Sequence, residues 1–575
     1  MKIDNQNIIG VFIYNEIVQT AHYKNITLQV HSMRKMFVVN TLHLTRFPDK
    51  IFCTIVTPLY TQSFMENNNL LAAVDLGSNS FRLSVGRIEE RNGEAHVFAI
   101  DRLKETVRLA AGLDDDKVLS DEAIERAVGV LKRFSERIQD FHPSQVRAIA
   151  TNTFRVAQNR ELLLQKAEEA LGFPIEVVSG PEEARLVFSG VAHELPISDK
   201  NRLVVDIGGG STEFIIGKGY DSVLVKSLSI GCVSFTKLYF PGGVVTSDSF
   251  KKAEINARNQ IQVLSKTYRK LGWAEAFGSS GSAKALVAVL QASGFSERGI
   301  TLAGMEKLKK VLVKTGSANS PLIHDLKDDR VEVLPAGLAI MMAAFKELKI
   351  EQMNQGDGAL RVGVLYDMLG RKTASDIRAG TVAQYMHRYR VDAKQASRVR
   401  LLADALYSSA LRVSQEDKEK WHHDLQLLLR WACDLHEVGL SIAQSSYHRH
   451  SAYVLQYADM PGFSKDEQEI LSRLNLASQG KLSKVEINAL ADEEWQAILC
   501  MRLAVMFLRN RQAIHLENLA LEINNKHICL SISKRWLANH PLTEFSLNNE
   551  KQDWENSGFK FTINLISQNQ NGVDN

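Results

Sequence analysis

The chain has 575 residues, of which 45% are hydrophobic and 23% charged, and its formal net charge is +3. This composition is ordinary for a globular protein, and the length predicts about three to five domains. The small net charge excludes a global field that would attract nucleic acid, so any polyanion site has to be local. The 5 cysteines form no C-x-x-C pair, and no apolar run reaches the roughly 18 residues that a transmembrane helix needs. We therefore expect a cytoplasmic protein with no disulfides, no zinc site, no nucleic-acid partner and no integral membrane segment.

Residues 1–67 differ in character from the rest of the chain. They contain short apolar patches without a clear helical period and without the layout of a signal peptide. Met65 begins a polar lead, MENNN, into the first clear strand. We expect Met65 to be the true start and residues 1–64 to be translated upstream sequence. The alternative is a genuine extension that is disordered or binds a partner, since chain termini are often loosely attached.

A motif that occurs twice follows this segment. Residues 71–83 read LAAVDLGSNSFRL, and residues 203–216 read LVVDIGGGSTEFII. Each predicts a buried strand, an aspartate at its end, a tight glycine turn and a return strand. Glycine lets backbone N–H groups approach phosphate oxygens, and carboxylates hold the accompanying cation. Two such hairpins that face each other predict a phosphate clamp, and the alternative is two ordinary hairpins. The predicted phosphate-binding residues of the clamp are Asp75, Gly77, Ser78, Asn79 and Ser80 in the first hairpin and Gly208, Gly209, Gly210 and Ser211 in the second.

The segments around these hairpins predict two α/β lobes. In the first lobe we expect strands over 146–150 and 175–178 and helices over 120–140, 161–171 and 182–191. Strands that alternate with helices are typical of an α/β lobe. In the second lobe, FGSSGSA predicts a glycine turn before a helix over 284–290. A helix N-terminus that follows small residues is a common anion-binding site, so we add Gly281 and Ser282 to the predicted phosphate-binding residues.

The chain changes character after the second lobe. Residues 372–510 predict a predominantly helical domain that is rich in Arg, His and Gln. A basic stretch from Arg371 to Arg400 at its start is either a track for a long polyanion or a solvated helix face. Beyond residue 516, alternating runs predict the short strands of a small terminal domain, at 519–523, 528–532 and 560–565.

One pair of acidic residues predicts a metal site. Asp206 and Glu213 flank the second glycine turn, so both can face a common cation across the hairpin. Magnesium prefers one or two carboxylates together with water and phosphate oxygens, which this arrangement can supply. The alternative for Glu213 is a solvated strand residue.

A second pair, Glu182 and Glu183, predicts the catalytic base. Glu183 shares a helix face with apolar residues, where a carboxylate is costly unless it is used or paired. We therefore expect Glu183 to orient or deprotonate a water molecule, the alternative being a carboxylate that only favours the helix dipole. Glu182 lies beside Arg185 and is expected to be a surface ion-pair partner. Arg155, just after a predicted strand, is a candidate to neutralise phosphate oxygens, although taken alone it reads as a surface arginine.

Several motifs in one order resemble the exopolyphosphatase/guanosine pentaphosphatase family. Besides the two hairpins, they are SGPEEARLVFSGVAH, GCVSFTKLYFPGG, FGSSGSAKAL, GALRVGVLYDMLGR, LHEVGL and HRHSAYVLQYADMPGF. The resemblance covers about residues 68–575 and is greatest to the long bacterial exopolyphosphatases. It implies an α/β fold with two actin-like (ribonuclease-H-like) lobes, then a helical HD-like domain and a small α+β C-terminal domain. With the sequence pattern it places the extension at 1–67, the lobes at 68–192 and 193–371, the helical domain at 372–510 and the last domain at 511–575.

The resemblance also implies an activity. Family members remove terminal phosphate from inorganic polyphosphate, or convert guanosine pentaphosphate to guanosine tetraphosphate, with magnesium and often potassium. Carried over by motif, Glu183 and Arg155 are catalytic, and Asp206 and Glu213 hold the metal. The family further implies a homodimer, and a cytoplasmic protein that can be peripheral to the inner membrane. We expect polyphosphate as the substrate, with guanosine pentaphosphate hydrolysis, a kinase-like transfer to an acceptor, and a non-catalytic polyphosphate sensor as alternatives.

The chain departs from the family pattern at two places. Val362 stands where many relatives have Glu. This difference concerns hinge behaviour at the junction of the lobes, and the catalytic residues are unchanged. His436 is followed by Glu437 instead of the Asp of a metal-binding HD pair, so no second metal centre is expected. For His448 and His450, packing roles are favoured over phosphate contacts.

Overall fold

The computed structural model describes residues 69–91, 94–372, 376–411, 419–514 and 519–567, together with four short strands before residue 56. The chain divides into two compact units, Met1–Leu70 and Leu71–Asn575. The four strands belong to the first unit and form two antiparallel pairs, β1 (Ala21–Tyr23) with β2 (Ile26–Leu28) and β3 (Leu42–Phe47) with β4 (Lys50–Ile55). The expected start at Met65 lies outside the described residues and stays a prediction.

The second unit begins with a mixed sheet that forms lobe I. Its strand order is β7-β6-β5-β8-β9, with β6 and β7 antiparallel and β5, β8 and β9 parallel. The strands are β5 (Leu70–Leu76), β6 (Ser80–Arg91), β7 (Glu94–Thr106), β8 (Val146–Ala150) and β9 (Ile175–Val177). The helices of this lobe are α2 (Asp121–Ile138), α3 (Asn152–Val156), α4 (Arg160–Leu171) and α5 (Gly180–His193). The predicted strands and helices are confirmed to within a few residues.

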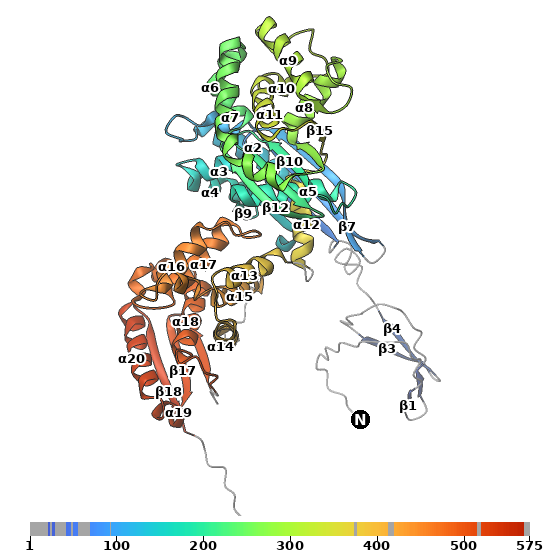
Figure 1. Cartoon of the computed structure of the whole chain (residues 1–575). Coiled ribbons are helices and arrows are strands. Elements are labelled where there is room, and N and C mark those ends of the chain that lie inside the picture. Colours follow the sequence, from blue (N-terminus) through green and yellow to red (C-terminus); the bar gives the residue numbers. More distant parts are fainter. Residues whose placement is uncertain are drawn as a thin grey trace, which may run out of the picture. The chain divides into compact units, whose positions relative to one another are not determined.

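Lobe II repeats this arrangement around the second hairpin. Its order is β12-β11-β10-β13-β15-β14, and β10 runs parallel to β13 as β5 does to β8. The strands are β10 (Arg202–Ile207), β11 (Thr212–Lys218), β12 (Asp221–Leu228), β13 (Glu275–Ser279), β14 (Ile300–Thr301) and β15 (Gln352–Gln355). The helices are α6 (Cys232–Tyr239), α7 (Ser247–Leu271), α8 (Ser280–Ala292), α9 (Leu302–Thr315), α10 (Asp328–Val331) and α11 (Leu334–Leu348) (Figure 1). The mixed α/β class is confirmed, and the repeated strand order is what two related lobes require.

The glycine segment FGSSGSA is not a loop. Strand β13 continues to Ser279 and α8 begins at Ser280, so Gly281 and Ser282 lie in the first turn of the helix. Ser280 has a φ of +72°, a left-handed conformation that reverses the chain within one residue. The predicted start of this helix at residue 284 is therefore four residues late.

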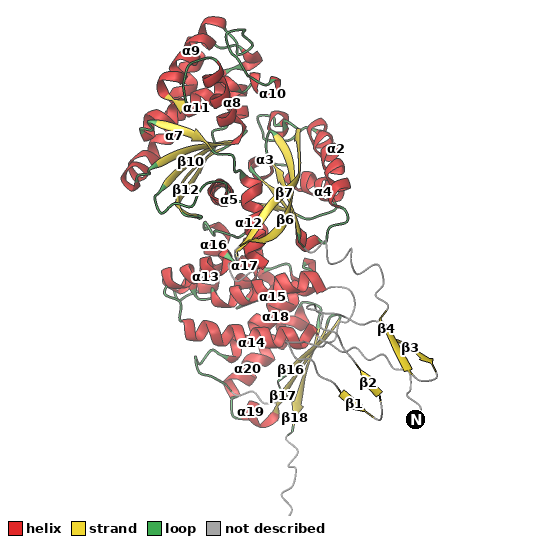
Figure 2. Cartoon of the chain, turned by 90° about the vertical axis from the view of Figure 1, so that its right-hand side faces the viewer, coloured by secondary structure: helices red, strands yellow, loops and turns green. Residues whose placement is uncertain are grey.

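Helix α5 and helix α12 (Leu360–Lys372) lie between the two sheets, as Figure 2 shows. One buried cluster joins Leu71 and Ile149 of lobe I to Val204 and Phe277 of lobe II through apolar residues of these helices. The two helices touch through glycines: a Cβ on Gly190 would lie 2.2 Å from the Ala359 carbonyl oxygen, and one on Gly363 would lie 1.8 Å from the Leu186 carbonyl oxygen. Helix α12 also contacts β6 and β7, so it packs on lobe I although it follows lobe II in the sequence.

The last part of the unit is helical and ends in a small sheet. The helices are α13 (Ile377–Arg388), α14 (Ala393–Leu411), α15 (Glu419–Asp434), α16 (Tyr447–Tyr457), α17 (Lys465–Ala477) and α18 (Asp492–Phe507). They are followed by β16 (Ala520–Asn524), β17 (His527–Ser533), α19 (Lys534–Ala538), α20 (Pro541–Asn556) and β18 (Lys560–Ile566). The three predicted strands are confirmed. One hydrophobic core unites both segments, with Trp495 of α18 packed against Trp554 and Phe559. Among the described residues, no helix is both long and apolar enough to span a membrane.

The contact between α5 and α12 predicts a large effect for Gly363→Ala. Because the new methyl group would overlap a backbone carbonyl that cannot rotate away, the helices have to separate, and we expect a loss of about 1–3 kcal/mol or more in the free energy of unfolding. The matched control is Gly380→Ala in α13, where a Cβ meets nothing within 4 Å. Since alanine favours helix, the control should be unchanged or up to about 1 kcal/mol more stable. Urea denaturation measures both, and equal stabilities of the two variants would contradict the close contact.

Candidate active site

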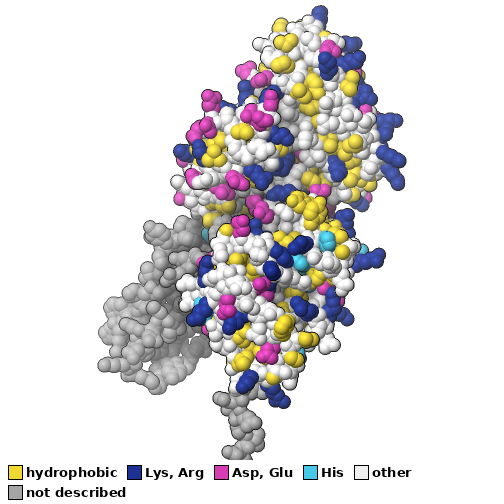
Figure 3. All heavy atoms as spheres, turned by 90° about the vertical axis from the view of Figure 1, so that its left-hand side faces the viewer, with side chains coloured by type: hydrophobic (Ala, Val, Ile, Leu, Met, Phe, Trp, Pro, Cys, Tyr) yellow, Lys and Arg dark blue, Asp and Glu magenta, His cyan; other side chains and the backbone are white. Residues whose placement is uncertain are grey.

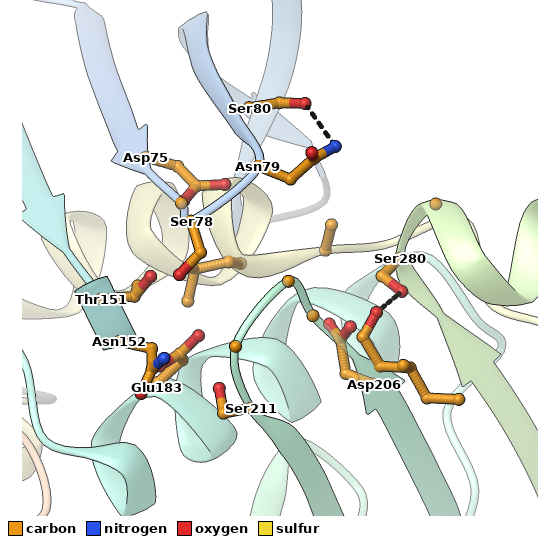
Figure 4. A pocket seen from close by; sticks show the side chains of 18 of the residues that line it. Asp75, Ser78, Asn79, Ser80, Thr151, Asn152, Glu183, Asp206, Ser211 and Ser280 are labelled. Carbon is orange, nitrogen blue, oxygen red and sulfur yellow. Dashed lines mark hydrogen bonds between the residues drawn. The ribbon is translucent and has the colours of Figure 1, made fainter. Parts of the chain in front are cut away.

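The two hairpins, the N-terminus of α5 and the N-terminus of α8 line one cleft between the lobes (Figure 4). Thirteen of the fifteen predicted site residues line it: Asp75, Gly77, Ser78, Asn79, Ser80, Glu183, Asp206, Gly208, Gly209, Gly210, Ser211, Glu213 and Gly281. Ser282 is set behind the lining, where its hydroxyl donates to the Ile207 carbonyl at 3.0 Å. Arg155 does not line the cleft either, and it contacts the site by donating a hydrogen bond to Glu183. The predicted residues are thus brought together, and their roles stay predictions.

The glycine turns allow the two hairpins to meet backbone against backbone. A Cβ on Gly209 would lie 3.0 Å from Ser78 Cβ and 3.3 Å from the Asn79 nitrogen. A Cβ on Gly210 would lie 1.9 Å from Asn152 Nδ2. Side chains at these two positions would push the lobes apart. Glycine is therefore required because lobe I approaches the turn closely, and not because of an unusual φ. The approach leaves backbone N–H groups from both lobes at the same cleft, which suits phosphate oxygens.

Glu183 is held in the cleft by the start of α5 and by an arginine. The Ser179 hydroxyl caps the helix by accepting the Glu182 N–H at 3.2 Å. Arg155 Nη1 donates to Glu183 Oε2 at 2.9 Å and also to the Val178 carbonyl at 2.8 Å. Burial raises the pKa of Glu183, and the charge of Arg155 opposes part of that rise. The carboxylate therefore has a fixed orientation and a raised affinity for a proton, which are the properties of a general base.

Asp206 and Glu213 form a second acidic centre. They are directly opposite each other in the β10–β11 register. Burial raises the pKa of Asp206 to about 6, and burial together with the charges of Glu183 and Asp206 raises the pKa of Glu213 well above its usual value. Glu213 is 1% exposed, so its interpretation as a solvated strand residue is wrong.

A divalent cation fits this donor set. The buried carboxylates repel one another, and a cation would remove that cost. Over the described part of the chain, no three His, Cys, Asp or Glu side chains are close enough to hold a metal by themselves. Magnesium needs only one or two carboxylates when water and phosphate oxygens complete its shell. Asp206 and Glu213 are the residues that would hold it.

Sequence reasoning missed several arginines at the site. Arg82 and Arg330 line the cleft from lobe I and lobe II, and Arg330 lies against Gly281, where a Cβ would be 2.5 Å from its guanidinium. Arg361 of α12 donates from Nε to Ser84 Oγ at 2.9 Å, and burial together with the charge of Arg82 lowers its pKa to about 10. Strand alternation places Arg82 on the same face as Ser80, a signal that was readable in the first motif. No local pattern distinguishes Arg330 from a surface arginine.

One prediction about charged residues is wrong and another is not tested. Glu182 is 2% exposed, and its carboxylate accepts two hydrogen bonds from Arg185, so the predicted ion pair forms in the interior and not at the surface. The basic stretch is partly paired, because Arg371 lies 3.1 Å from Asp367 and Arg400 lies 3.2 Å from Asp434, and its use as a track stays a prediction. The Arg371–Asp367 pair follows the i,i+4 spacing of a helix, whereas Arg400 and Asp434 come from different helices.

Two histidines of the helical domain, His436 and His448, have packing contacts. His436 is buried, with Nδ1 at 2.7 Å from the Cys433 carbonyl. Glu437, which stands in place of the HD aspartate, pairs with Arg511. His448 is also buried, and its Nε2 accepts from Lys484 Nζ at 2.7 Å.

Comparison with known proteins identifies the family. The model of the Ppx/GppA phosphatase family matches residues 88–372, and that of Ppx/GppA phosphatase, domain III, matches residues 377–551. Among solved structures, an exopolyphosphatase from Cytophaga hutchinsonii is 23% identical with a TM-score of 0.47, over 52% of this chain and 98% of that one. The Aquifex aeolicus Ppx/GppA family member is 25% identical with a TM-score of 0.44, over 53% of this chain and 98% of that one. MreB5 of Spiroplasma citri bound to ADP is 14% identical with a TM-score of 0.24, over 54% and 98%. The two family models together cover most of the chain from residue 88 to residue 551, and the chain belongs to the Ppx/GppA phosphatase family.

Proposed function

We propose that the protein is an exopolyphosphatase, which removes the terminal phosphate of inorganic polyphosphate by attack of water. The observation that carries this proposal is Glu183, a buried carboxylate fixed by Arg155 in a cleft lined by two glycine turns. The repeated strand order supports the actin-like form of the two lobes. The HD-like relationship of the helical domain and a homodimer remain part of this proposal.

The proposed reaction is an in-line displacement at the terminal phosphorus. Backbone N–H groups of the glycine turns, with Arg82 and Arg330, bind the phosphate oxygens. Glu183 aligns the water and accepts its proton as the water oxygen bonds to phosphorus and the bridging P–O bond breaks. Asp206 and Glu213 would hold a magnesium ion, which would supply neutralisation of phosphate charge. Positioning and charge neutralisation account for most of the rate in such a transfer.

A basic patch on the helical domain favours a long substrate over a nucleotide. The patch comprises Arg449 at the start of α16, Lys484 and Arg509. Figure 3 shows Lys, Arg and His side chains gathered on this face of the helical domain. Burial and the charges of Arg449 and Arg502 lower the pKa of Lys484 to about 8, which indicates positive charge without full compensation. A polyanion long enough to extend from the cleft to this patch would gain contacts there, whereas guanosine pentaphosphate carries few phosphates beyond the one that is removed.

Substitution of Glu183 tests the proposed base. Glu183→Gln keeps the shape but cannot accept a proton, so kcat should fall by about 10²–10⁴-fold while polyphosphate binding is retained. Phosphate release from long polyphosphate and from guanosine pentaphosphate, assayed side by side, measures both the effect and the substrate preference. The matched control is Glu194→Gln at the exposed C-terminal end of α5, which should behave as wild type. Near-normal turnover by Glu183→Gln would exclude the proposed role.

The raised pKa of Asp206 predicts how metal and pH act on stability. In the folded chain this pKa is about 6, against 3.8 for an ordinary Asp, so the folded state binds the proton more tightly between these pH values. Stability therefore falls as pH rises through this window, and above it the ionised carboxylate costs on the order of 1–3 kcal/mol. Asp206→Asn removes the charge, so without magnesium near neutral pH the variant should have a higher Tm than wild type. The difference should shrink below about pH 4, where Asp206 is protonated in both states.

Magnesium should act in the opposite direction. It should raise the Tm of wild type by neutralising the buried carboxylates, and should raise that of Asp206→Asn much less. Differential scanning fluorimetry with and without magnesium, at several pH values, measures these shifts. An equal magnesium response of both proteins would place the metal elsewhere.

The basic patch predicts a dependence on chain length. Replacing Arg449 and Arg509 together by Gln should raise KM several-fold for long polyphosphate and weaken its salt dependence, because fewer counterions are released on binding. KM for a polyphosphate short enough to end within the cleft should not change. Arg160→Gln, an exposed arginine of lobe I, is the control. Equal effects on long and short chains would argue against a track through this patch.

A further inference from the structure

Helix α5, which carries Glu183, meets the helical domain at Gly462. The backbone N–H of Gly462, in the loop before α17, donates to Glu182 Oε2 at 2.8 Å. The carbonyl of the same residue accepts from Arg371 Nη2 of α12 at 3.0 Å. Gly462 has a φ of +89°, and a Cβ there would lie 2.9 Å from Arg378 Cγ. Both backbone polar groups of Gly462 are thus bound by the two helices that lie between the lobes.

Glu182 is saturated with donors at this junction. Its Oε2 accepts from Arg185 Nε at 2.8 Å in addition to the Gly462 N–H, and its Oε1 accepts from Arg185 Nη2 at 2.7 Å. Its side chain is 1% exposed. A buried carboxylate with this many charge-assisted hydrogen bonds is held in one position. It does not line the cleft, so it has no direct contact with substrate there.

A chain of buried ion pairs continues from Glu182 into both lobe I and the helical domain. Arg185 also donates to Asp367 Oδ1 at 2.6 Å, and Arg147 of β8 donates to Asp367 Oδ2 at 2.6 Å. Arg371 binds the same carboxylate and lies 3.9 Å from Glu467 of α17. The network spans β8, α5, α12 and α17, so the position of Glu182 depends on the helical domain as well as on its own lobe.

Glu182 precedes the proposed base by one residue. Both are in the first turn of α5, where the Glu183 N–H donates to the Ser179 carbonyl at 2.9 Å. A first turn of helix has few internal hydrogen bonds and frays easily unless side chains hold it. Here Ser179 holds one side of the turn and the Glu182 side chain holds the other. Movement of Glu182 would therefore shift the backbone from which Glu183 reaches the water.

We propose that Glu182 is a positioning residue for Glu183, and that the helical domain takes part in the reaction through the Gly462 peptide that holds Glu182 in place. This inference rests on the proposed role of Glu183 as the base. It assigns a catalytic contribution to a domain whose residues do not line the cleft. Because the contribution acts on the alignment of water and not on phosphate binding, it appears in kcat and not in KM.

Glu182→Gln tests the inference from the side of α5. A glutamine has the same shape, but its amide nitrogen replaces one of two oxygens that both accept from N–H groups, so at least one donor faces another donor. We expect kcat on a short polyphosphate to fall by about 10–100-fold, the scale of a misplaced catalytic group, with KM within about twofold of wild type. Hydrogen exchange followed by mass spectrometry on the full chain should show faster exchange in the segment 179–187.

Gly462→Ala tests it from the side of the helical domain. The added methyl group is opposed by the positive φ and by Arg378, so the peptide has to move without any change to α5 itself. The same loss of kcat and the same faster exchange in 179–187 are expected. The matched control is Tyr385→Phe, which removes one hydrogen bond, at 2.7 Å, to the Asp459 carbonyl of the same loop and touches neither α5 nor α12. This control should lose stability while keeping the kcat of wild type.

The outcomes separate this inference from the proposed function. Reduced kcat in both variants, with normal KM and with faster exchange confined to 179–187, supports positioning. Variants that lose stability as Tyr385→Phe does but keep kcat within twofold would overturn the inference while leaving the proposed function intact. A wild-type chain that releases no phosphate from polyphosphate or guanosine pentaphosphate would overturn both. If kcat falls as much in Tyr385→Phe as in the two test variants, the inference is also overturned. The loss of kcat would then come from a general loosening of the loop.

Discussion

Four carboxyl groups, those of Asp75, Glu183, Asp206 and Glu213, line one cleft, and each of these residues is at most 9% exposed. Burial raises the pKa of each, and the negative charges of neighbours raise those of Asp206 and Glu213 further. Such a cluster is unfavourable by itself and persists only where the surrounding fold determines its geometry. The surroundings are two glycine turns in backbone contact and arginines that approach from both lobes. The stability lost here is the counterpart of the cation and phosphate site that we propose.

Helix α5 meets this constraint by contacting both lobes, α12 and the loop before α17. Its apolar residues join the cores of both sheets, and Gly190 lets α12 approach to backbone contact. Its first turn carries two adjacent carboxylates that point about 100° apart on a helix. Glu183 turns toward the cleft and Glu182 toward the helical domain, so one turn of helix connects the reaction site to a domain that is remote in sequence. The two carboxylates have different partners. Glu183 is bound by Arg155, whereas Glu182 is bound by Arg185 and by the Gly462 N–H.

Much of this site was predictable from local pattern. The hairpins, the opposition of Asp206 and Glu213, and the inward direction of Glu183 follow from alternation in strands and from the apolar face of a helix. The interior position of Glu182 was not predictable, since helical spacing indicates its Arg185 partner but not the segment around Gly462 that covers the pair. Arg371 shows the same limit, because helical spacing indicates its Asp367 partner but not its hydrogen bond to the Gly462 carbonyl. Arg330 reaches the cleft only because α10 packs beside Gly281, and its own neighbours carry no signal of that contact.

The sequence by itself determined the elements, the duplicated hairpins and the chemical types gathered at them, because these depend on short-range steric preference and on periodicity along the chain. The tertiary structure decided which charges are neutralised and which are left for a ligand. Glu182 and Arg371 have local charge partners and are also bound by the backbone of Gly462, which is far along the chain, whereas Asp206 and Glu213 face each other. That distinction depends on distances between segments that are remote in sequence, and electrostatic energies in a buried site change steeply with those distances.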